Sequence, residues 1–157
     1  MIVAFCGHSK YIPSTDDEAK ILKILEEKVK DEAVEFFLGE YGSFDSFAYE
    51  CCKKFKRTHP KAKLVFITPY ISDSYRKNRF EYQKDRFDLT VYPELENVPP
   101  KYAISHRNRW MVEQADFIVA YVKHEYGGAY TMYRYAKRKG KVAYNIAEEG
   151  ISEKDEK

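Results

Sequence analysis

The sequence has no apolar run long enough to cross a bilayer, and it has few cysteines. A membrane-spanning helix needs about 20 consecutive apolar residues, whereas runs of this 157-residue chain such as FIVAYV, at 117–122, are far shorter. The N-terminal MIVAFCGHSK carries no basic segment ahead of its apolar stretch, so we expect no signal peptide. Three cysteines, an odd number, do not make a disulfide framework. These absences favour a cytoplasmic protein without a membrane partner.

Motifs for metals and for the common phosphate loop are missing as well. The four histidines show no HxxxH spacing, and no Cys-x-x-Cys pair accompanies them, so we expect neither a metal nor a cofactor. The net charge of +2 is too small by itself to indicate a nucleic-acid or membrane surface. Neither the net charge nor a metal or phosphate-loop motif therefore indicates a function, and we turn to the loops between the predicted strands and helices.

Short β-branched and aromatic runs alternate with helical patterns along the chain. Strands are predicted at 2–6, 33–38, 63–68, 117–122 and 141–146, with a further short candidate in LTVY at 89–92. Helices are predicted after a capping box of Thr15 and Glu18, after a capping Ser43, from about Tyr102 to Gln114, and from Gly128 to Arg138 with Gly140 just beyond the last turn. This order predicts an α/β, Rossmann-like three-layer sandwich with a mainly parallel sheet. We expect one domain at 1–147 and a charged, flexible tail at 148–157.

Unusual polar stretches follow four of the predicted strands: GHS (7–9), GEYGSFD (39–45), TPY (68–70) and HEYGG (124–128). Ligands of open α/β sheets bind beyond the carboxyl ends of the strands, close to helix N-termini. We therefore expect these loops to form one crevice, in which Gly127 and Gly128 present bare N–H groups to an anion. The alternative is that the glycines only allow sharp turns and close packing.

A second polar cluster, SHRNRWMVEQAD, occupies 105–116. Cations are disfavoured at a helix N-terminus, so Arg107 and Arg109 near a predicted helix start suggest an anionic partner. A solvated turn with an internal acidic partner is the alternative.

The segment 74–87 interleaves basic with aromatic residues, which is compatible with single-stranded nucleic acid. It also contains Glu81 and Asp85, so we interpret it as an amphipathic helix that walls one edge of the ligand pocket.

Taken together, FCGHSK, GSFDSFAYE and SHRNRWMVEQADFIVAY…EYGGAYTMYRYAKRKGK resemble the SLOG superfamily, particularly its YpsA-like branch. The superfamily also includes the LOG-type phosphoribohydrolases and the DNA-processing protein A domain. The resemblance runs from the first strand to about Ile146 and is weakest over 71–101. It implies a Rossmann-like fold that binds a nucleotide or related phosphate at the glycine loop. It implies ligand contacts from Gly7, Ser43, Asp45, Asn108, Gly127 and Gly128.

The match to the LOG enzymes is partial. Their Pro-Gly-Gly-x-Gly-Thr-x-x-Glu motif aligns with Gly127, Gly128 and Thr131, and an upstream arginine with Arg107. The proline, third-glycine and glutamate positions hold Tyr126, Tyr130 and Arg134. Cleavage of an N-glycosidic bond is carboxylate work, so the arginine removes the group that the chemistry needs. Glu125, Asp45 or Glu50 could replace it, although Asp45 could equally stabilise its helix dipole and Glu50 could pair with a neighbouring lysine.

The sequence thus favours ligand binding, by a sensor or sequestering protein, over turnover. A nucleotide N-glycosidase is the alternative, with Asp45 and Arg107 as its catalytic residues, and a DNA- or protein-interaction module is the second alternative. SLOG relatives often dimerise, and we expect a homodimer with the Trp110 helix as a candidate interface. The predicted ligand-binding residues are Gly7, His8, Ser9, Gly42, Ser43, Asp45, Thr68, Pro69, Tyr70, Arg107, Asn108, Tyr126, Gly127, Gly128, Ala129 and Thr131.

Overall fold

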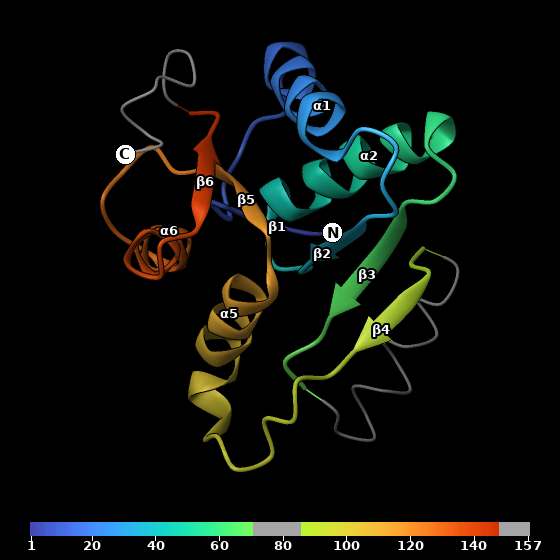
Figure 1. The fold of residues 1–157 in the computed structure, drawn as a ribbon. Helices are drawn as coiled ribbons and strands as arrows, with labels where there is room; N and C mark the ends of the chain where they lie inside the picture. The colour runs from blue at the N-terminus through green and yellow to red at the C-terminus, as the bar shows by residue number, and fades with distance from the viewer. Residues whose placement is uncertain (71–85, 148–157) are drawn as a thin grey trace.

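Six parallel strands form the centre of the molecule in the computed structural model, which describes residues 1–70 and 86–147 (Figure 1). The strands are β1 (Ile2–Gly7), β2 (Glu35–Leu38), β3 (Lys63–Ile67), β4 (Leu89–Val91), β5 (Phe117–Tyr121) and β6 (Val142–Asn145). The helices are α1 (Thr15–Val29), α2 (Ser43–Thr58), α5 (Ala103–Gln114) and α6 (Gly128–Arg138), with a short 3-10 helix η2 (Pro100–Tyr102) before α5. The α/β, Rossmann-like prediction is confirmed, and every described strand pairing is parallel.

The strand order is β4-β3-β2-β1-β5-β6. From β1 the chain builds one half of the sheet through β2, β3 and β4, then returns to the other side of β1 to add β5 and β6. The direction of winding therefore reverses between β1 and β5, and ligands of open sheets bind at such a point.

Alternate residues of each strand face opposite layers of helix. Val3 and Phe5 of β1 belong to one apolar cluster with residues of α1 and α2. Ala4 and Cys6 belong to a second cluster with Met111 of α5 and residues of α6. Figure 1 shows α1 and α2 on one side of the sheet and α5 and α6 on the other, which is the expected three-layer arrangement.

The helix ends correct two predictions. The cap of α1 is Ser14, whose Oγ accepts a hydrogen bond from the Asp17 amide, and Thr15 is already helical. The cap of α2 is Gly42, so Ser43 is the first helical residue and its side chain does not cap the helix. Gly140, with φ of +73°, follows the last turn of α6 as predicted.

Two expectations lie outside the described residues: the amphipathic helix predicted within 74–87, apart from its last two positions, and the tail at 148–157. Among the helices that the structure describes, none combines the length and the apolar character needed to cross a membrane. No group of three or more His, Cys, Asp or Glu side chains in the described ranges is arranged to hold a metal ion.

Candidate functional site

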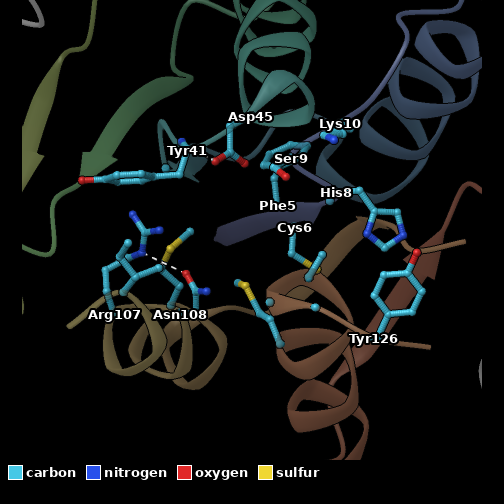
Figure 2. A pocket seen from close by; sticks show the side chains of 18 of the residues that line it. Phe5, Cys6, His8, Ser9, Lys10, Tyr41, Asp45, Arg107, Asn108 and Tyr126 are labelled. Atoms are coloured by element: carbon cyan, nitrogen blue, oxygen red, sulfur yellow. Dashed lines mark hydrogen bonds between the residues drawn. The ribbon is translucent and has the colours of Figure 1, made fainter. Parts of the chain in front are cut away.

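A cavity of about 450 Å³ lies at the carboxyl ends of β1, β2 and β5, on the side of the sheet covered by α5 and α6 (Figure 2). Its walls come from the loops that follow these three strands and from residues of α2, α5 and α6. Asp45, Tyr41 and Arg107 gather at one end of the cavity, and His8 and Tyr126 at the other (Figure 2). The cavity thus lies at the reversal point of the sheet.

The N-terminus of α6 forms an open part of this wall. Gly127 caps the helix with φ of +91°, a conformation that side chains disfavour. A Cβ at Gly127 or at Gly128 would have no described atom within 4 Å. Thr131 donates to the Gly127 carbonyl from both its amide and its hydroxyl, at 3.1 and 3.0 Å. The amides of Gly128 and Ala129, earlier in that turn, have no hydrogen-bond partner within 1–70 and 86–147. They are donors available to an anion.

The N-terminus of α2, by contrast, is closed by the chain itself. Gly42 has φ of +126°, and a Cβ there would lie 2.5 Å from Ser9 Cα. The Ser9 carbonyl accepts hydrogen bonds from the Ser43 amide and the Ser43 hydroxyl, both at 2.9 Å. The Tyr11 amide donates to Ser43 Oγ at 2.6 Å. Ser43 therefore fastens the β1–α1 loop to α2.

Asp45 and Arg107 approach each other beside a buried glycine. A Cβ on Gly39 would lie 3.0 Å from Arg107 Nη1 and 3.2 Å from Asp45 Oδ2, so a larger residue there would require these groups to shift. Asp45 Oδ2 accepts a hydrogen bond from the Tyr41 amide at 2.9 Å. Burial raises the pKa of Asp45 from 3.8 to about 6, opposed by the Tyr41 hydrogen bond and by the Arg107 charge. The carboxyl group can therefore gain or lose a proton near neutral pH.

Arg107 is almost fully buried, and it does not lie at a helix start. It occupies the second turn of α5, so the argument from the helix dipole was wrong for this residue. Its Nη1 donates to the Ile67 carbonyl at 2.8 Å and its Nε to Asn108 Oδ1 at 2.9 Å. Its guanidinium carbon lies 5.4 Å from the centre of the Tyr41 ring. Arg107 therefore joins α5 to the end of β3 while it lines the cavity.

Three stacked rings hold the β5–α6 loop. His8 lies parallel to His124 with 3.7 Å between ring centres, and His124 stacks on Tyr126 at 4.2 Å. The Lys123 amide donates to His8 Nε2 at 2.8 Å, so the neutral ring carries its proton on Nδ1. Burial, and then the neighbouring His124, lower the pKa of His8 below its usual value. A neutral His8 thus links the loop after β1 to the loop that carries the two glycines.

Cys6 also lines the cavity, from the end of β1. Burial, and to a smaller extent the Asp45 charge, raise the pKa of this thiol to about 12. The thiolate needed for nucleophilic chemistry is therefore absent near neutral pH.

The structure brings most of the predicted ligand-binding residues to this cavity, although their contact with a ligand stays a prediction. Those that line it are Gly7, His8, Ser9, Asp45, Arg107, Asn108, Tyr126, Gly127, Gly128 and Ala129. Those outside the lining are Gly42, Ser43, Thr68, Pro69, Tyr70 and Thr131. Thr68 is buried and its hydroxyl donates to the Tyr70 carbonyl, so the loop after β3 folds onto itself. This loop was expected in the crevice, but β3 is separated from β1 by β2.

Other lining residues were not predicted as ligand-binding: Phe5, Cys6, Lys10, Gly39, Tyr41, Ile104, Met111, His124 and Met132. Lys10, Gly39, Tyr41 and His124 lie beside or within the polar stretches of the sequence, so including every residue of those loops would have found them. Phe5, Cys6, Met111 and Met132 are buried core residues, and the sequence pattern marks them only as such.

The carboxylates proposed to replace the LOG glutamate are not equivalent. Asp45 lines the cavity, whereas Glu50 and Glu125 are exposed and do not. Arg134, at the glutamate position, lies on the exposed face of α6, where Nη1 donates to the Tyr130 hydroxyl at 2.8 Å. Among the described residues that line the cavity, Asp45 is the one carboxylate, so carboxylate chemistry by this part of the chain depends on it.

Comparisons with known proteins find similarity to solved structures but none at the level of sequence families. No protein-family model matches the chain, and no curated protein is detectably similar to it in sequence. DNA processing protein A from Helicobacter pylori superimposes with a TM-score of 0.57 at 16% identity, covering 91% of this chain and 63% of that one. The chain thus spans less than two thirds of that protein, which was described for its single-stranded DNA binding mode. TM1055, a structural genomics target, superimposes with a TM-score of 0.54 at 13% identity, covering 90% of this chain and 71% of that one.

At these identities the similarity concerns the fold. Both structures agree with the fold that the resemblance in the sequence predicts, and the chain has a Rossmann-like fold.

Proposed function

We propose that the protein binds a nucleotide or nucleotide-derived phosphate ligand in this cavity, as a sensor or a sequestering protein. The observation that carries the proposal is the open N-terminus of α6. No packing contact within the described chain requires glycine at position 128, and its φ is not positive. The absence of a side chain instead leaves the amides of Gly128 and Ala129 accessible from the cavity, as phosphate binding at a helix N-terminus requires.

The charges and rings around the cavity suit such a ligand. Lys10 and Arg107 contribute positive charge, and the helix dipole of α6 adds to it. Tyr126 is 69% exposed beside the glycines and offers a flat surface to a nucleobase. The cavity volume falls in the range of sites for small molecules.

The second candidate is hydrolysis of an N-glycosidic bond, and Asp45 is the observation that favours it. Its Oδ1 has no hydrogen-bond partner in the described ranges, and its raised pKa suits proton transfer. Arg134 does not contribute, because it lies outside the cavity. An Asp45→Asn variant that still binds the ligand but no longer releases the base would establish this activity.

Thermal unfolding in the presence of nucleoside mono-, di- and triphosphates, cyclic nucleotides and ADP-ribose tests binding. A ligand at about 100 times its dissociation constant adds roughly 2.7 kcal/mol, a rise in Tm on the order of 5–10 °C for this size. Gly128→Asp should abolish the shift, because its carboxylate would occupy the anion position. The matched control is Ser105→Asp, which adds the same charge to the first turn of α5 at an exposed position outside the cavity. No shift with any ligand of the panel would overturn the proposal.

A further inference from the structure

Positive charge is concentrated at the C-terminal part of α6 and just beyond it. Residues 128–141 contain five cations and no acidic residue. The whole chain has 27 Lys and Arg against 25 Asp and Glu, a net +2, so the rest of the chain carries −3. The cations are Arg134, Lys137, Arg138, Lys139 and Lys141. One helix therefore differs in charge from the remainder of the molecule.

Several of these cations lack an acidic partner. Arg134, Arg138 and Lys139 are exposed, as is Arg109 on the neighbouring α5, and none forms an ion pair with any described residue. On the α1–α2 side, lysines do find such partners: Lys54 with Glu18 and Lys56 with Asp88. The unpaired charge on α5 and α6 thus remains available to an external anion.

Tyrosine rings are interleaved with these cations. The Arg134 guanidinium carbon lies 5.7 Å from the centre of the Tyr130 ring, one helical turn away. Arg109, Arg138 and Lys139 surround Tyr135 at 5.6, 5.8 and 5.5 Å from its centre. Three cations around one ring make the densest positive cluster on this face.

Among the described residues, the acidic side chain in contact with the cluster is that of Glu113. It accepts a hydrogen bond from the Tyr135 hydroxyl at 2.5 Å. A single carboxylate does not balance Arg109, Arg138 and Lys139, so the cluster keeps an excess of positive charge. We call Arg109, Tyr130, Arg134, Tyr135, Arg138 and Lys139 the α5–α6 face.

We propose that the α5–α6 face binds single-stranded nucleic acid. Cations in excess attract the phosphate backbone, and partly exposed tyrosine rings offer surfaces on which unpaired bases stack. An acidic protein or an anionic membrane would also be attracted by the cations, but rings set between cations match the alternation of bases and phosphates along a single strand, so we assign the face to nucleic acid. The inference does not rest on the proposed nucleotide site, since Arg134, Tyr135 and Arg138 lie outside the cavity lining.

Fluorescence anisotropy with a labelled single strand of about 20 nucleotides tests this, at salt concentrations from about 50 to 200 mM. The triple variant Arg134→Gln, Arg138→Gln, Lys139→Gln should weaken binding by roughly 10-fold or more and reduce the salt slope by about 2. The control is Lys23→Gln, Lys53→Gln, Arg57→Gln, which removes the same charge from exposed positions of α1 and α2. It should change the affinity by less than about 3-fold, because it leaves the α5–α6 face intact.

Tyr130→Ala separates base stacking from charge. It should weaken binding of the oligonucleotide by roughly 10-fold and leave the binding of inorganic polyphosphate unchanged. Equal losses in the two triple variants would overturn the proposal, as would undetectable binding of the oligonucleotide. A further outcome is that polyglutamate or anionic vesicles compete as strongly as the unlabelled strand does. If Tyr130→Ala then also had no effect, the face would belong to another anionic partner and the proposal would be overturned. Gly128→Asp should keep oligonucleotide binding, so this test and the test of the nucleotide site can fail separately.

Discussion

The N-termini of α2 and α6 have similar backbone conformations but different surroundings. Each follows a parallel strand, each is capped by a glycine with positive φ, and neither has a side-chain capping bond. At α2 the space beyond Gly42 is filled by Ser9, whose carbonyl takes the first amide of the helix. At α6 a Cβ on Gly127 or on Gly128 would meet no described atom from elsewhere in the chain within 4 Å. A glycine turn before a helix therefore indicates a binding site only where the chain does not fill the space itself.

The largest effect should come from Gly42→Ala. The new Cβ would meet Ser9 Cα and a backbone with φ of +126°, so we expect a loss of about 3 kcal/mol in the free energy of unfolding. The corresponding fall in Tm is roughly 6–12 °C, measurable by circular dichroism. Gly140→Ala is the control, because φ there is +73° but a Cβ has open space. If both substitutions cost the same, packing against Ser9 contributes nothing and the comparison fails.

Asp45 should make stability depend on pH. Its pKa in the folded state is raised to about 6, so the folded protein holds this proton more tightly than the unfolded chain does. The resulting stabilisation is complete below about pH 4 and is lost as the pH rises through 6; we expect about 1–3 kcal/mol. Urea unfolding of the wild type and of Asp45→Asn over pH 4–7 measures it. An identical pH dependence in both proteins would show that Asp45 titrates normally.

Ser43→Ala should lower the stability of the fold without weakening ligand binding. It removes the acceptor of the Tyr11 amide and the donor to the Ser9 carbonyl, so about 1–2 kcal/mol of stability should be lost. The ligand-dependent rise in Tm should persist, because Ser43 does not line the cavity. A loss of that rise would mean that the α2 terminus also takes part in binding.

The smallest effect on stability is expected at Gly128→Ala. With no positive φ and no close neighbour among the described atoms, the methyl group should change the free energy of unfolding by less than about 1 kcal/mol, in the stabilising direction. Ligand affinity, measured by calorimetry, should nevertheless fall, since the methyl group would stand beside the donor amides. Unchanged affinity would place the anion elsewhere in the cavity.

The sequence predicted the framework well because buried strands and amphipathic helices leave local patterns. The runs at 2–6 and 117–122 became the two strands that flank the reversal point. The prediction was poorer where the outcome depends on which strands become neighbours. Ligand contacts were expected from Thr68 and Ser43. The Thr68 hydroxyl instead donates to the Tyr70 carbonyl within its own loop, and the Ser43 hydroxyl donates to Ser9 in the β1–α1 loop.

The apolar part of the cavity could not be predicted from local patterns at all. Cys6, Met111 and Met132 each occupy an apolar position that the sequence pattern assigns to the core. Only the three-dimensional arrangement shows that they also line the cavity.

Trp110 was considered for a dimer interface. It stacks in parallel on Phe37 with 5.7 Å between ring centres, so part of its surface is used within the chain. The homodimer itself stays a prediction.

The hydrogen bond from the Lys123 amide to His8 has a consequence for rates. It joins the two loops on either side of the reversal point before any ligand arrives, and the stacked His124 and Tyr126 continue that support to the edge of Gly127. An incoming anion therefore meets donors that are already in position. Association should then proceed in one step whose rate rises linearly with ligand concentration, and affinities of related ligands should differ mainly in how slowly each one leaves.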